Sequence, residues 1–465
     1  MLSIYLHIPF CKHRCSYCDF NTYAKQEDSI PAYVDALVKE IQFVGNRTSQ
    51  TIKTIFFGGG TPSLLSSGQF DSILQALFSS FDISPNAEIT IEANPGTVSS
   101  EKLDSIRRAG INRISFGVQS ANTEELQMLE REHNFFDVIE AVSSARKAGF
   151  DNLNLDLIYG LPEQTLSTWQ TTVKRVLDLH PEHISAYALT LEHGTPFGKW
   201  AEKGLLPLPN PDLAADMYEW ISEYLAQSGY VQYEISNWSK YERGKKKEYY
   251  CQHNLQYWKS LPYLGLGAGA HGYVNGIRYS NVLRIKTYIE RLVNSDSQFS
   301  NLEYPLSPAT VNHTKQSIQE NMSDYMLNNL RLVHAGVAEA DFKSRFGSGL
   351  LEIYPKEIES LIHKGLLEWE KETSEVSRTS EVFKINQAWK IIGKSGVYKI
   401  CLTWRTCAKG PIGPAPRTVS GVGTSNCCTC IHSRRRGNRS LYNAWLNNFR
   451  ANLWFKTSSL KAKCL

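Results

Sequence analysis

Three cysteines near the N-terminus, Cys11, Cys15 and Cys18, are close enough in sequence to bind one metal centre. They follow an apolar run over residues 2–10 and are separated by three and then two residues. A four-iron, four-sulfur cluster normally takes four thiolates, so three thiolates from one loop leave one iron for a ligand that is not protein. The amino and carboxylate groups of S-adenosylmethionine (SAM) can chelate such an iron, and an electron from the cluster can cleave its sulfonium into a carbon radical.

Two other interpretations of these cysteines are open. A structural zinc site usually has two pairs of ligands far apart in the sequence, but no cysteine follows Cys18 before Cys251. Free structural thiols are the second alternative, although Cys15 and Cys18 lie in a polar and aromatic stretch rather than an apolar strand. The spacing therefore favours an iron–sulfur cluster.

The composition is typical of a soluble globular protein, with 42% hydrophobic and 21% charged residues. A chain of 465 residues is long enough for one large domain and one or two smaller ones. The sequence has no apolar stretch of membrane-spanning length and no signal-peptide pattern at its N-terminus. Because cysteines without a disulfide framework are typical of a reducing compartment, we expect a cytoplasmic protein.

The C-terminal part differs in composition from the rest of the chain. Fourteen of the 50 Lys and Arg residues but none of the 46 Asp and Glu residues lie from Lys390 onwards, so residues 1–389 have a net charge of about −10. Six of the ten cysteines lie in the same part: Cys401, Cys407, Cys427, Cys428, Cys430 and Cys464. We interpret residues 390–465 as an atypical tail that is disordered or not native; a nucleic-acid-binding arm or a second metal site is the alternative.

Strands and helices alternate along the first half of the chain. A helical pattern lies between each pair of six predicted strands: residues 2–8, 51–57, 88–92, 113–118, 152–158 and 183–189. Right-handed crossovers between parallel strands require such alternation, so we predict an α/β fold with a partial (β/α)6 barrel. Functional groups of such a barrel gather at the C-terminal ends of its strands, which is where the cysteines, Glu92, Gln119 and Asp156 are expected.

The rest of the chain has weaker patterns. We expect residues 230–238 to be irregular and aromatic and residues 243–247 to form a basic loop. Residues 320–370 have helical periodicity with a stop at Gly365, which indicates a small helical or winged-helix-like domain. The expected division is a partial barrel, a closing segment, a C-terminal domain and the tail: residues 1–230, 231–305, 306–389 and 390–465.

Gly58–Pro62, with the sequence Gly-Gly-Gly-Thr-Pro, follows the second predicted strand. Glycines expose the main chain, so a ligand can approach it closely. A Walker phosphate loop would need a Gly-Lys-Ser/Thr ending, and a dinucleotide fingerprint would need other glycine spacing. The segment is either a tight turn or, one strand after the cysteines, a cradle for the amino acid end of SAM.

Seven motifs are spread over residues 1–370: YLHIPFC (5–11), CxxxCxxC (11–18), GGGTP (58–62), IEANP (91–95), RISFGVQ (113–119), NLDLIYGLP (154–162) and HNLQYW (253–258). Together they resemble the radical SAM family of oxygen-independent coproporphyrinogen III dehydrogenases and their relatives, most closely the branch of HemW-like haem chaperones. The resemblance implies a 4Fe–4S cluster held by Cys11, Cys15 and Cys18. It also implies contacts to SAM from Tyr5, Gly59, Gly60, Thr61, Glu92, Gln119, Arg131 and Asp156.

The chemistry of these residues agrees with the implied contacts. Carboxylates such as Glu92 and Asp156, and the amide of Gln119, can hydrogen-bond ribose hydroxyls, and Arg131 can pair with the SAM carboxylate. Each residue alone could be an ordinary polar residue at a strand end. That alternative is weakest for Glu92 and Asp156, which end apolar strands.

One position separates the branches of this family. The dehydrogenases carry a further cysteine two positions after the third, where this chain has Phe20. The HemW-like branch is implied to bind haem, sometimes covalently, and to transfer it to acceptor proteins, with a flavodoxin or ferredoxin as electron donor. His253 in the HNLQYW motif is the expected haem contact, although a histidine is more often a hydrogen-bonded structural residue.

Two other functions are open. One is a dehydrogenase that oxidatively decarboxylates the propionates of coproporphyrinogen III, and the other is an RNA-modifying radical SAM enzyme that uses the basic tail. We expect no nucleic-acid partner, and we assign no catalytic residue; SAM cleavage is possible but undecided from sequence. Beyond about residue 375 the resemblance ends.

Overall fold

The computed structural model describes residues 2–241, 249–294, 301–372 and 380–385. They belong to one compact unit of the chain, Met1–Trp404. The expected basic loop at residues 243–247 and the expected tail at residues 390–465 lie outside the described residues. The expected domain boundaries stay predictions.

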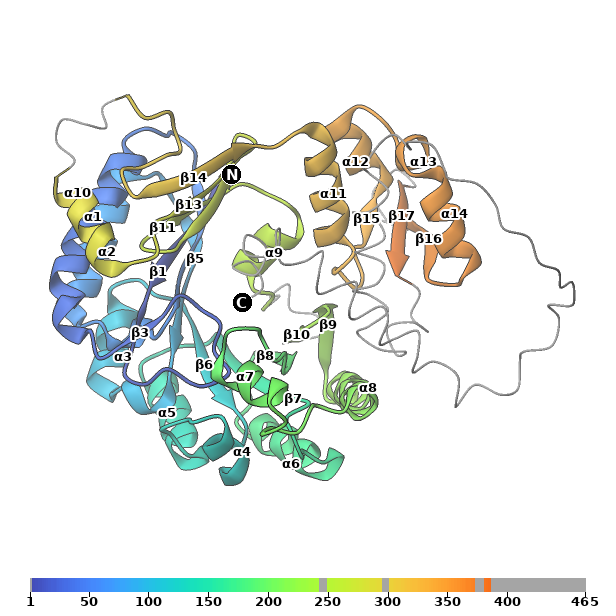
Figure 1. Ribbon diagram of the computed structural model, residues 1–465, viewed down its shortest axis with the longest axis horizontal. Coiled ribbons are helices and arrows are strands. Elements are labelled where there is room, and N and C mark those ends of the chain that lie inside the picture. Colours follow the sequence, from blue (N-terminus) through green and yellow to red (C-terminus); the bar gives the residue numbers. More distant parts are fainter. Residues whose placement is uncertain (1, 242–248, 295–300, 373–379, 386–465) are drawn as a thin grey trace, which may run out of the picture. The chain divides into compact units, whose positions relative to one another are not determined.

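The centre of the fold is a twelve-stranded sheet whose parallel part contains six neighbouring strands from the first half of the chain (Figure 1). These strands are β1 (Leu2–Ile8), β4 (Ile52–Gly59), β5 (Ile83–Ala93), β6 (Arg113–Gln119), β7 (Leu153–Tyr159) and β8 (His183–Ala188). The helices between them are α1 (Ile30–Gly45), α2 (Ser67–Ser80), α3 (Ser100–Arg108), α4 (Thr123–Met128), α5 (Phe135–Lys147) and α6 (Leu166–Leu177). The predicted α/β fold with a partial (β/α)6 barrel is confirmed.

The two faces of the parallel strands differ in polarity, because successive residues of a strand point to opposite faces. Apolar residues of one face form the main core with the helices, among them Ile4, Leu6, Ile55, Phe57 and Leu155. Buried polar residues alternate with them, among them Ser3, Thr54, Thr90, Ser115 and Asn154. The inner face of the barrel is therefore lined with polar groups.

Both edges of the parallel sheet are extended by later strands. Beyond β8 lies an antiparallel hairpin of β10 (Asn237–Lys240) and β9 (Tyr230–Glu234). The expectation that residues 230–238 are irregular is wrong, because pairing at this edge buries Tyr230, Tyr233 and Trp238. Helices α7 (Pro196–Glu202) and α8 (Pro211–Gln227) precede this hairpin.

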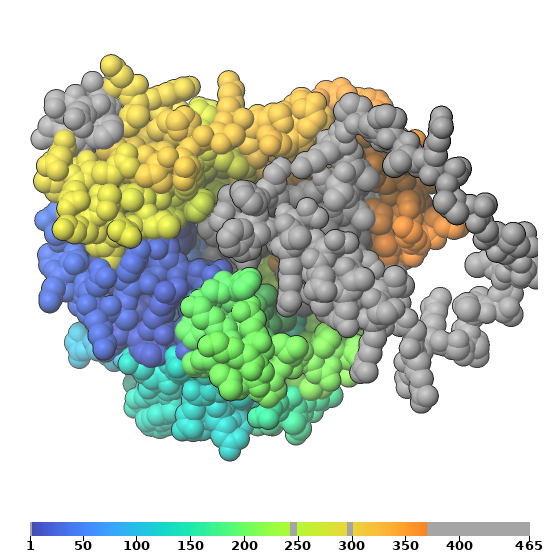
Figure 2. Space-filling model, in the orientation of Figure 1, coloured from blue at the N-terminus to red at the C-terminus, as the bar shows by residue number. Residues whose placement is uncertain are grey.

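At the other edge, β11 (Tyr263–Leu266) pairs parallel with β1. It is followed by the antiparallel strands β12 (His271–Val274), β13 (Ile277–Asn281) and β14 (Thr310–Lys315). Helix α10 (Ile285–Val293) packs on α1, where the rings of Tyr33 and Tyr288 are 5.0 Å apart. In the space-filling view the segment that contains α10, in yellow, lies directly on the N-terminal segment, in blue (Figure 2).

The C-terminal part has a separate apolar core, which includes Tyr325, Met326, Phe342 and Leu361. Its helices are α11 (Ile318–Asn329), α12 (Glu339–Phe346), α13 (Leu350–Ile353) and α14 (Pro355–His363), and its small sheet consists of β15 (Val337–Ala338), β17 (Ser380–Ile385) and β16 (Leu367–Glu372). Helix α14 ends just before Gly365, which has a φ of 65°, so the predicted helix stop is confirmed. Helices with a terminal hairpin fit the predicted winged-helix-like domain.

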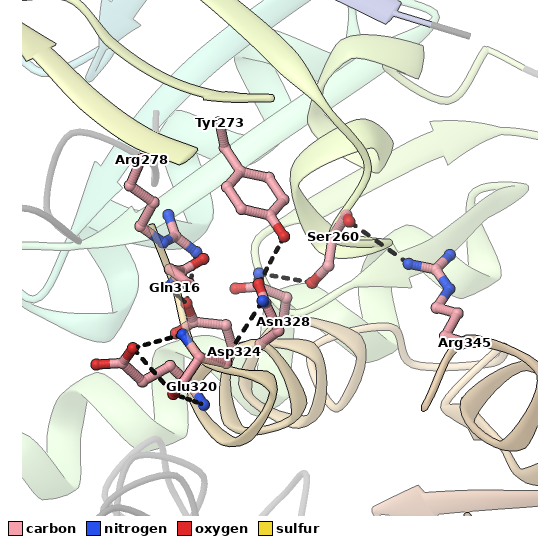
Figure 3. Close-up of polar contacts among 10 residues, drawn as sticks. Ser260, Tyr273, Arg278, Gln316, Glu320, Asp324, Asn328 and Arg345 are labelled. Carbon is pink, nitrogen blue, oxygen red and sulfur yellow. Dashed lines mark hydrogen bonds and ion pairs between the residues drawn. The ribbon is translucent and has the colours of Figure 1, made fainter. Parts of the chain in front are cut away.

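Polar contacts join α11 and α12 to the strands and turn before them (Figure 3). The guanidinium of Arg278 lies 2.5 Å from a carboxylate oxygen of Asp324, and the same oxygen accepts from Gln316 at 2.8 Å. Asn328 donates to the hydroxyl of Ser260 at 2.9 Å. These contacts tie the C-terminal helices to β13 and to the end of α9 (Gln252–Trp258).

Candidate iron–sulfur site

The three N-terminal cysteines lie on one loop that begins at the short strand β2 (Phe10–Cys11), which pairs with β3 (Tyr23–Ala24). The amide of Cys18 donates to the carbonyl of Cys15 at 3.0 Å, which closes a turn between them. All three side chains are partly exposed. They are therefore held together near the surface, after the C-terminal end of β1.

Two protein segments far along the chain hold this loop. The carboxylate of Glu130 accepts from the amide of Ser16 at 3.0 Å and lies 3.1 Å from the His13 ring. The amide of Phe197, in α7, donates to the carbonyl of Ser16 at 3.1 Å, and its ring packs near the Tyr17 ring. The loop is thus shaped by contacts with the segment after β6 and the segment after β8.

Two side chains donate hydrogen bonds to cysteine sulfurs. The Thr61 hydroxyl donates to Cys11 Sγ at 3.6 Å, and the Arg131 guanidinium donates to Cys15 Sγ at 3.8 Å. Arg131 also donates to the Gly117 carbonyl at 2.8 Å and to the Asn94 side-chain oxygen. Hydrogen bonds to sulfur are among the features that set the potential of iron–sulfur clusters.

The three thiols are the ligand set expected for the cluster. Among the described residues, no three His, Cys, Asp or Glu side chains are arranged to hold one metal ion. Burial raises the pKa of Cys11 to about 11, the hydrogen bond from Thr61 opposes this, and the neighbouring thiols Cys18 and Cys15 add to the rise.

The triple glycine packs against the chain that leads into the cysteine loop. Gly59 has a φ of 111°, and a Cβ there would lie 2.4 Å from the His7 ring. A Cβ on Gly60 would lie 2.5 Å from the Phe10 carbonyl oxygen. Close packing within the protein already requires these glycines, and their contact with SAM stays a prediction.

The two predicted carboxylates lie near each other inside the barrel. Glu92 accepts from the Gly59 amide at 3.0 Å, and burial, with the nearby charge of Asp156, raises the pKa of Glu92 to about 8. Asp156 accepts from Ser115 at 2.8 Å and from Asn154 at 2.7 Å, and burial raises its pKa as well. The expectation that Asp156 lies at a strand end is wrong, because β7 continues to Tyr159. Desolvated carboxylates such as these can bind a polar or cationic ligand.

Tyr5 and Gln119 lie in the same region. The Tyr5 hydroxyl is 3.0 Å from Nδ1 of His7, and its ring stacks on that of Phe56 with centroids 6.3 Å apart. Gln119 ends β6 with a φ of 66°, which is rare for a residue with a side chain and typical of functional strand ends. A Cβ on Gly117 would lie 3.0 Å from the Gln119 amide nitrogen and 3.2 Å from the Arg131 guanidinium, so these side chains lie together.

His253 lies on α9, inside the barrel, where its ring stacks on that of Phe56 with centroids 5.0 Å apart and lies 6.5 Å from the Tyr5 ring. Its ring nitrogens are 2.7 Å from the Thr54 hydroxyl and 2.9 Å from the Tyr257 hydroxyl, and its side chain is buried. Burial, and next the charge of Arg113, lower the pKa of His253 to about 3. Both ring nitrogens have protein partners, so contact with haem stays a prediction that would require breaking one of these hydrogen bonds.

Sequence reasoning missed two residues that shape this site. Asn94 contacts Thr61 and Arg131, and Glu130 holds the cysteine loop. Asn94 belongs to the IEANP motif, and Glu130 directly precedes Arg131, so both lie beside residues that the sequence singled out. Their local sequence does not indicate which segments their side chains contact. Their roles follow from strand register and loop packing.

Comparisons with known proteins agree with this geometry. The model of the radical SAM superfamily matches residues 5–176. The chain is 39% identical over 372 residues to the heme chaperone HemW of Bacillus subtilis (strain 168), covering 79% of this chain and 93% of that protein. It is 41% identical over 275 residues to the heme chaperone HemW of Escherichia coli (strain K12), covering 59% of this chain and 70% of that protein.

Among solved structures, the coproporphyrinogen III oxidase HemN of Escherichia coli, a radical SAM enzyme, has a similar fold. The TM-score is 0.71 at 22% sequence identity, covering 87% of this chain and 90% of that one. At this identity the similarity speaks for the fold alone, whereas the sequence relatives speak for the family. The chain belongs to the HemW family of radical SAM proteins.

Proposed function

We propose that this chain is a haem chaperone, which binds haem and transfers it to acceptor proteins with the support of a 4Fe–4S cluster and SAM. The observation that carries the proposal is the 39% identity to a heme chaperone HemW, of which the match covers 93%. Membership of the radical SAM family implies the cluster and SAM. We infer haem as the ligand because the relatives are haem chaperones.

The arrangement of the cysteines supports the same cofactors. Cys11, Cys15 and Cys18 would hold the cluster, and the remaining cysteine among the described residues, Cys251, is buried with its thiol 3.6 Å from a carboxylate oxygen of Glu88. Three ligands leave one iron open, where bound SAM can be cleaved by an electron from the cluster.

The side chains around the loop would hold SAM itself. We propose that Glu92, Gln119 and Asp156 bind the hydroxyl and amino groups and that Arg131 pairs with the carboxylate. The remaining proposed contacts come from the inner face of β1 and from the end of β4: Tyr5, Gly59, Gly60 and Thr61. These residues orient the ligand and exclude water, because most of them are partly or fully buried.

Phe20 favours the chaperone over the alternative coproporphyrinogen III dehydrogenase. It occupies the position at which the resembling dehydrogenases carry a further cysteine. In the structure, the Phe20 carbonyl accepts from the amide of Thr22 at 2.8 Å, and it is 3.3 Å from the Arg14 guanidinium. Its backbone thus helps to close the loop, but its side chain cannot replace a thiol in redox or ligand chemistry.

The proposed partners are haem, haem-accepting proteins and an electron donor such as a flavodoxin or ferredoxin, in the cytoplasm. No helix among the described residues is long and apolar enough to cross a membrane. The haem contact proposed from the sequence is His253. Its two hydrogen bonds inside the barrel make a structural role the simpler interpretation.

A haem titration tests this proposal. The anaerobically reconstituted protein is titrated with haem, a denaturing gel is stained for haem, and protoporphyrinogen formation is assayed in parallel. The expected result is stoichiometric haem binding without porphyrinogen oxidation, followed by transfer to a haem-depleted acceptor. Robust turnover of coproporphyrinogen III without stable haem binding would overturn the proposal and establish the dehydrogenase.

The same titration on His253→Gln and Tyr257→Phe separates the two possible roles of His253. Loss of haem binding in His253→Gln, with haem binding unchanged in Tyr257→Phe, would support a direct contact. Unchanged haem affinity with lower stability in both variants would show that His253 acts inside the barrel.

A further inference from the structure

Asn94 lies between the two side chains that donate to the cysteine sulfurs. Its side-chain nitrogen donates to the Thr61 hydroxyl oxygen at 3.2 Å, and its side-chain oxygen accepts from Arg131. We propose that Asn94 is a positioning residue that fixes the direction of the Thr61 hydroxyl, so that Thr61 donates its hydrogen to the sulfur of Cys11 and thereby raises the reduction potential of the cluster.

The direction of this chain of hydrogen bonds follows from the groups present. An arginine guanidinium has only donors, so Asn94 must turn its oxygen toward Arg131 and its amino group toward Thr61. The Thr61 oxygen then accepts a hydrogen bond, and its single hydrogen is free to point at Cys11 Sγ, 3.6 Å away. A cluster-bound thiolate has no hydrogen of its own, so Thr61 can only be the donor in this pair.

The backbone around Asn94 is fixed independently of these side chains. Asn94 directly follows β5 and precedes the short turn η3 (Pro95–Thr97). Its carbonyl accepts from the amide of Thr97 at 3.0 Å and from the Thr97 hydroxyl at 2.8 Å. The side chain therefore projects from an anchored position at a strand end.

Gly117 provides the space in which Asn94 and Arg131 meet. A Cβ at this position would lie 3.2 Å from the Arg131 guanidinium and 3.3 Å from the Asn94 oxygen. The Gly117 carbonyl also accepts from Arg131 at 2.8 Å. Arg131 thus contacts both Asn94 and Cys15. Through Arg131 and Thr61, the side chain of Asn94 is linked to two of the three cysteines, Cys15 and Cys11.

A donor aimed at a ligating sulfur stabilises the more negative, reduced cluster and so raises its potential. In Asn94→Asp, the new carboxylate would accept from both Arg131 and Thr61, so the Thr61 hydrogen would leave Cys11. The change adds no volume. This role depends on the proposal that the three cysteines hold the cluster, but not on haem transfer.

The test is the reduction potential of the reconstituted cluster, read by electron paramagnetic resonance at a series of poised potentials. The variants are Asn94→Asp, Thr61→Val, Thr61→Ser and the double variant Asn94→Asp/Thr61→Val. Asn210→Asp is the matched control, because it makes the same charge change at the N-terminus of α8, where Asp caps a helix as well as Asn does.

We expect Asn94→Asp to shift the one-electron reduction equilibrium about tenfold toward the oxidised cluster, which is about 59 mV. Thr61→Val should lower the potential in the same direction, and Thr61→Ser should restore it. If Asn94 acts through Thr61, adding Asn94→Asp to Thr61→Val should shift the equilibrium much less than in the wild-type background.

Two outcomes would overturn the inference. One is an unchanged potential in Asn94→Asp with full iron and sulfide content. The other is the same shift in both backgrounds, which would mean that the carboxylate acts through its charge alone. A wild-type protein that assembles no cluster would instead refute the proposed cofactor, so the two failures are distinguishable.

Discussion

The two ends of the barrel contain the same kinds of side chain in different states. At the C-terminal ends of the strands, three cysteines, His13 and Glu130 lie on or beside a partly exposed loop. Inside the barrel, Cys251 at the N-cap of α9, His253 in α9 and Glu88 in β5 are buried.

The difference lies in how completely the polar groups are paired. Glu88 accepts from the amides of Gln252 and His253, both at 3.0 Å, and from the Cys251 thiol. Gln256 donates to the Ser3 hydroxyl at 2.7 Å, which ties the same helix to β1. We call Cys251, His253 and Glu88 the plug, because their polar groups are paired inside the barrel. In the loop, Cys11 accepts a hydrogen bond from Thr61, and Cys15 accepts one from Arg131 and lies 4.0 Å from the Glu130 carbonyl oxygen. Residue type alone does not separate the two.

The largest expected effect distinguishes the two sets of cysteines. Replacing Cys11, Cys15 and Cys18 together by Ala should abolish iron and sulfide binding and the broad brown absorption, because no ligands remain at the loop. Cys251→Ala should retain the full cluster content. Iron and sulfide analysis after anaerobic reconstitution, with circular dichroism as the folding control, measures both. Iron retained in the triple variant would place the cluster elsewhere.

The two histidines should differ next. His253→Ala removes two buried hydrogen bonds and leaves a cavity, so the free energy of unfolding should fall by about 3 kcal/mol. His13→Ala, at a side chain that is 46% exposed, should change it by less than about 0.5 kcal/mol. Denaturant titrations of the apoproteins measure both values. Similar losses for the two variants would contradict the plug.

The two glutamates sharpen the comparison further. In Glu88→Gln one oxygen becomes an amino group, so a buried donor loses its acceptor, and stability should fall by about 2 kcal/mol without loss of iron. Glu130→Gln keeps an oxygen that can accept from Ser16, and it should cost less than about 1 kcal/mol. A larger loss of stability in Glu130→Gln than in Glu88→Gln would show that the carboxylate matters more for the cysteine loop than for the plug.

A pH dependence is expected from the buried carboxyl of Glu92. A carboxyl with a pKa of about 8 in the folded protein and 4.5 in the unfolded chain binds more protons when folded, so stability falls as the pH rises from about 4.5 to about 8. Glu92→Gln should remove this contribution, so its stability relative to wild type should rise over the same range. Unfolding free energies at pH 5, 6.5 and 8 measure it; parallel curves for the two proteins would refute the raised pKa.

The sequence predicted the parallel part of the fold because each strand there is an apolar run between helical patterns. It did not predict the edges. Residues 230–238 look irregular, because their aromatic residues become buried only by pairing with β8 and packing on α8. The short helix α9 has too few residues to show a period.

The site was predicted in part for a similar reason. The spacing of the three cysteines is local, and Glu92 lies at the end of a recognisable strand. Asp156 was expected at a strand end as well, but it lies in the middle of β7, because this strand continues to Tyr159. Asn94 and Glu130 depend on which segment lies beside the loop, and the state of His253 depends on Thr54, 199 residues away. Such contacts have no signature in a short stretch of sequence.

The protein contacts that hold Ser16 have a consequence for assembly. Glu130 and Phe197 bind the loop through its main chain at 3.0 and 3.1 Å, and neither contact involves a cysteine sulfur. We expect that oxygen can destroy the cluster without collapsing the loop. Repair would then need only new iron and sulfide, and the damaged protein would remain a usable scaffold rather than a substrate for proteases.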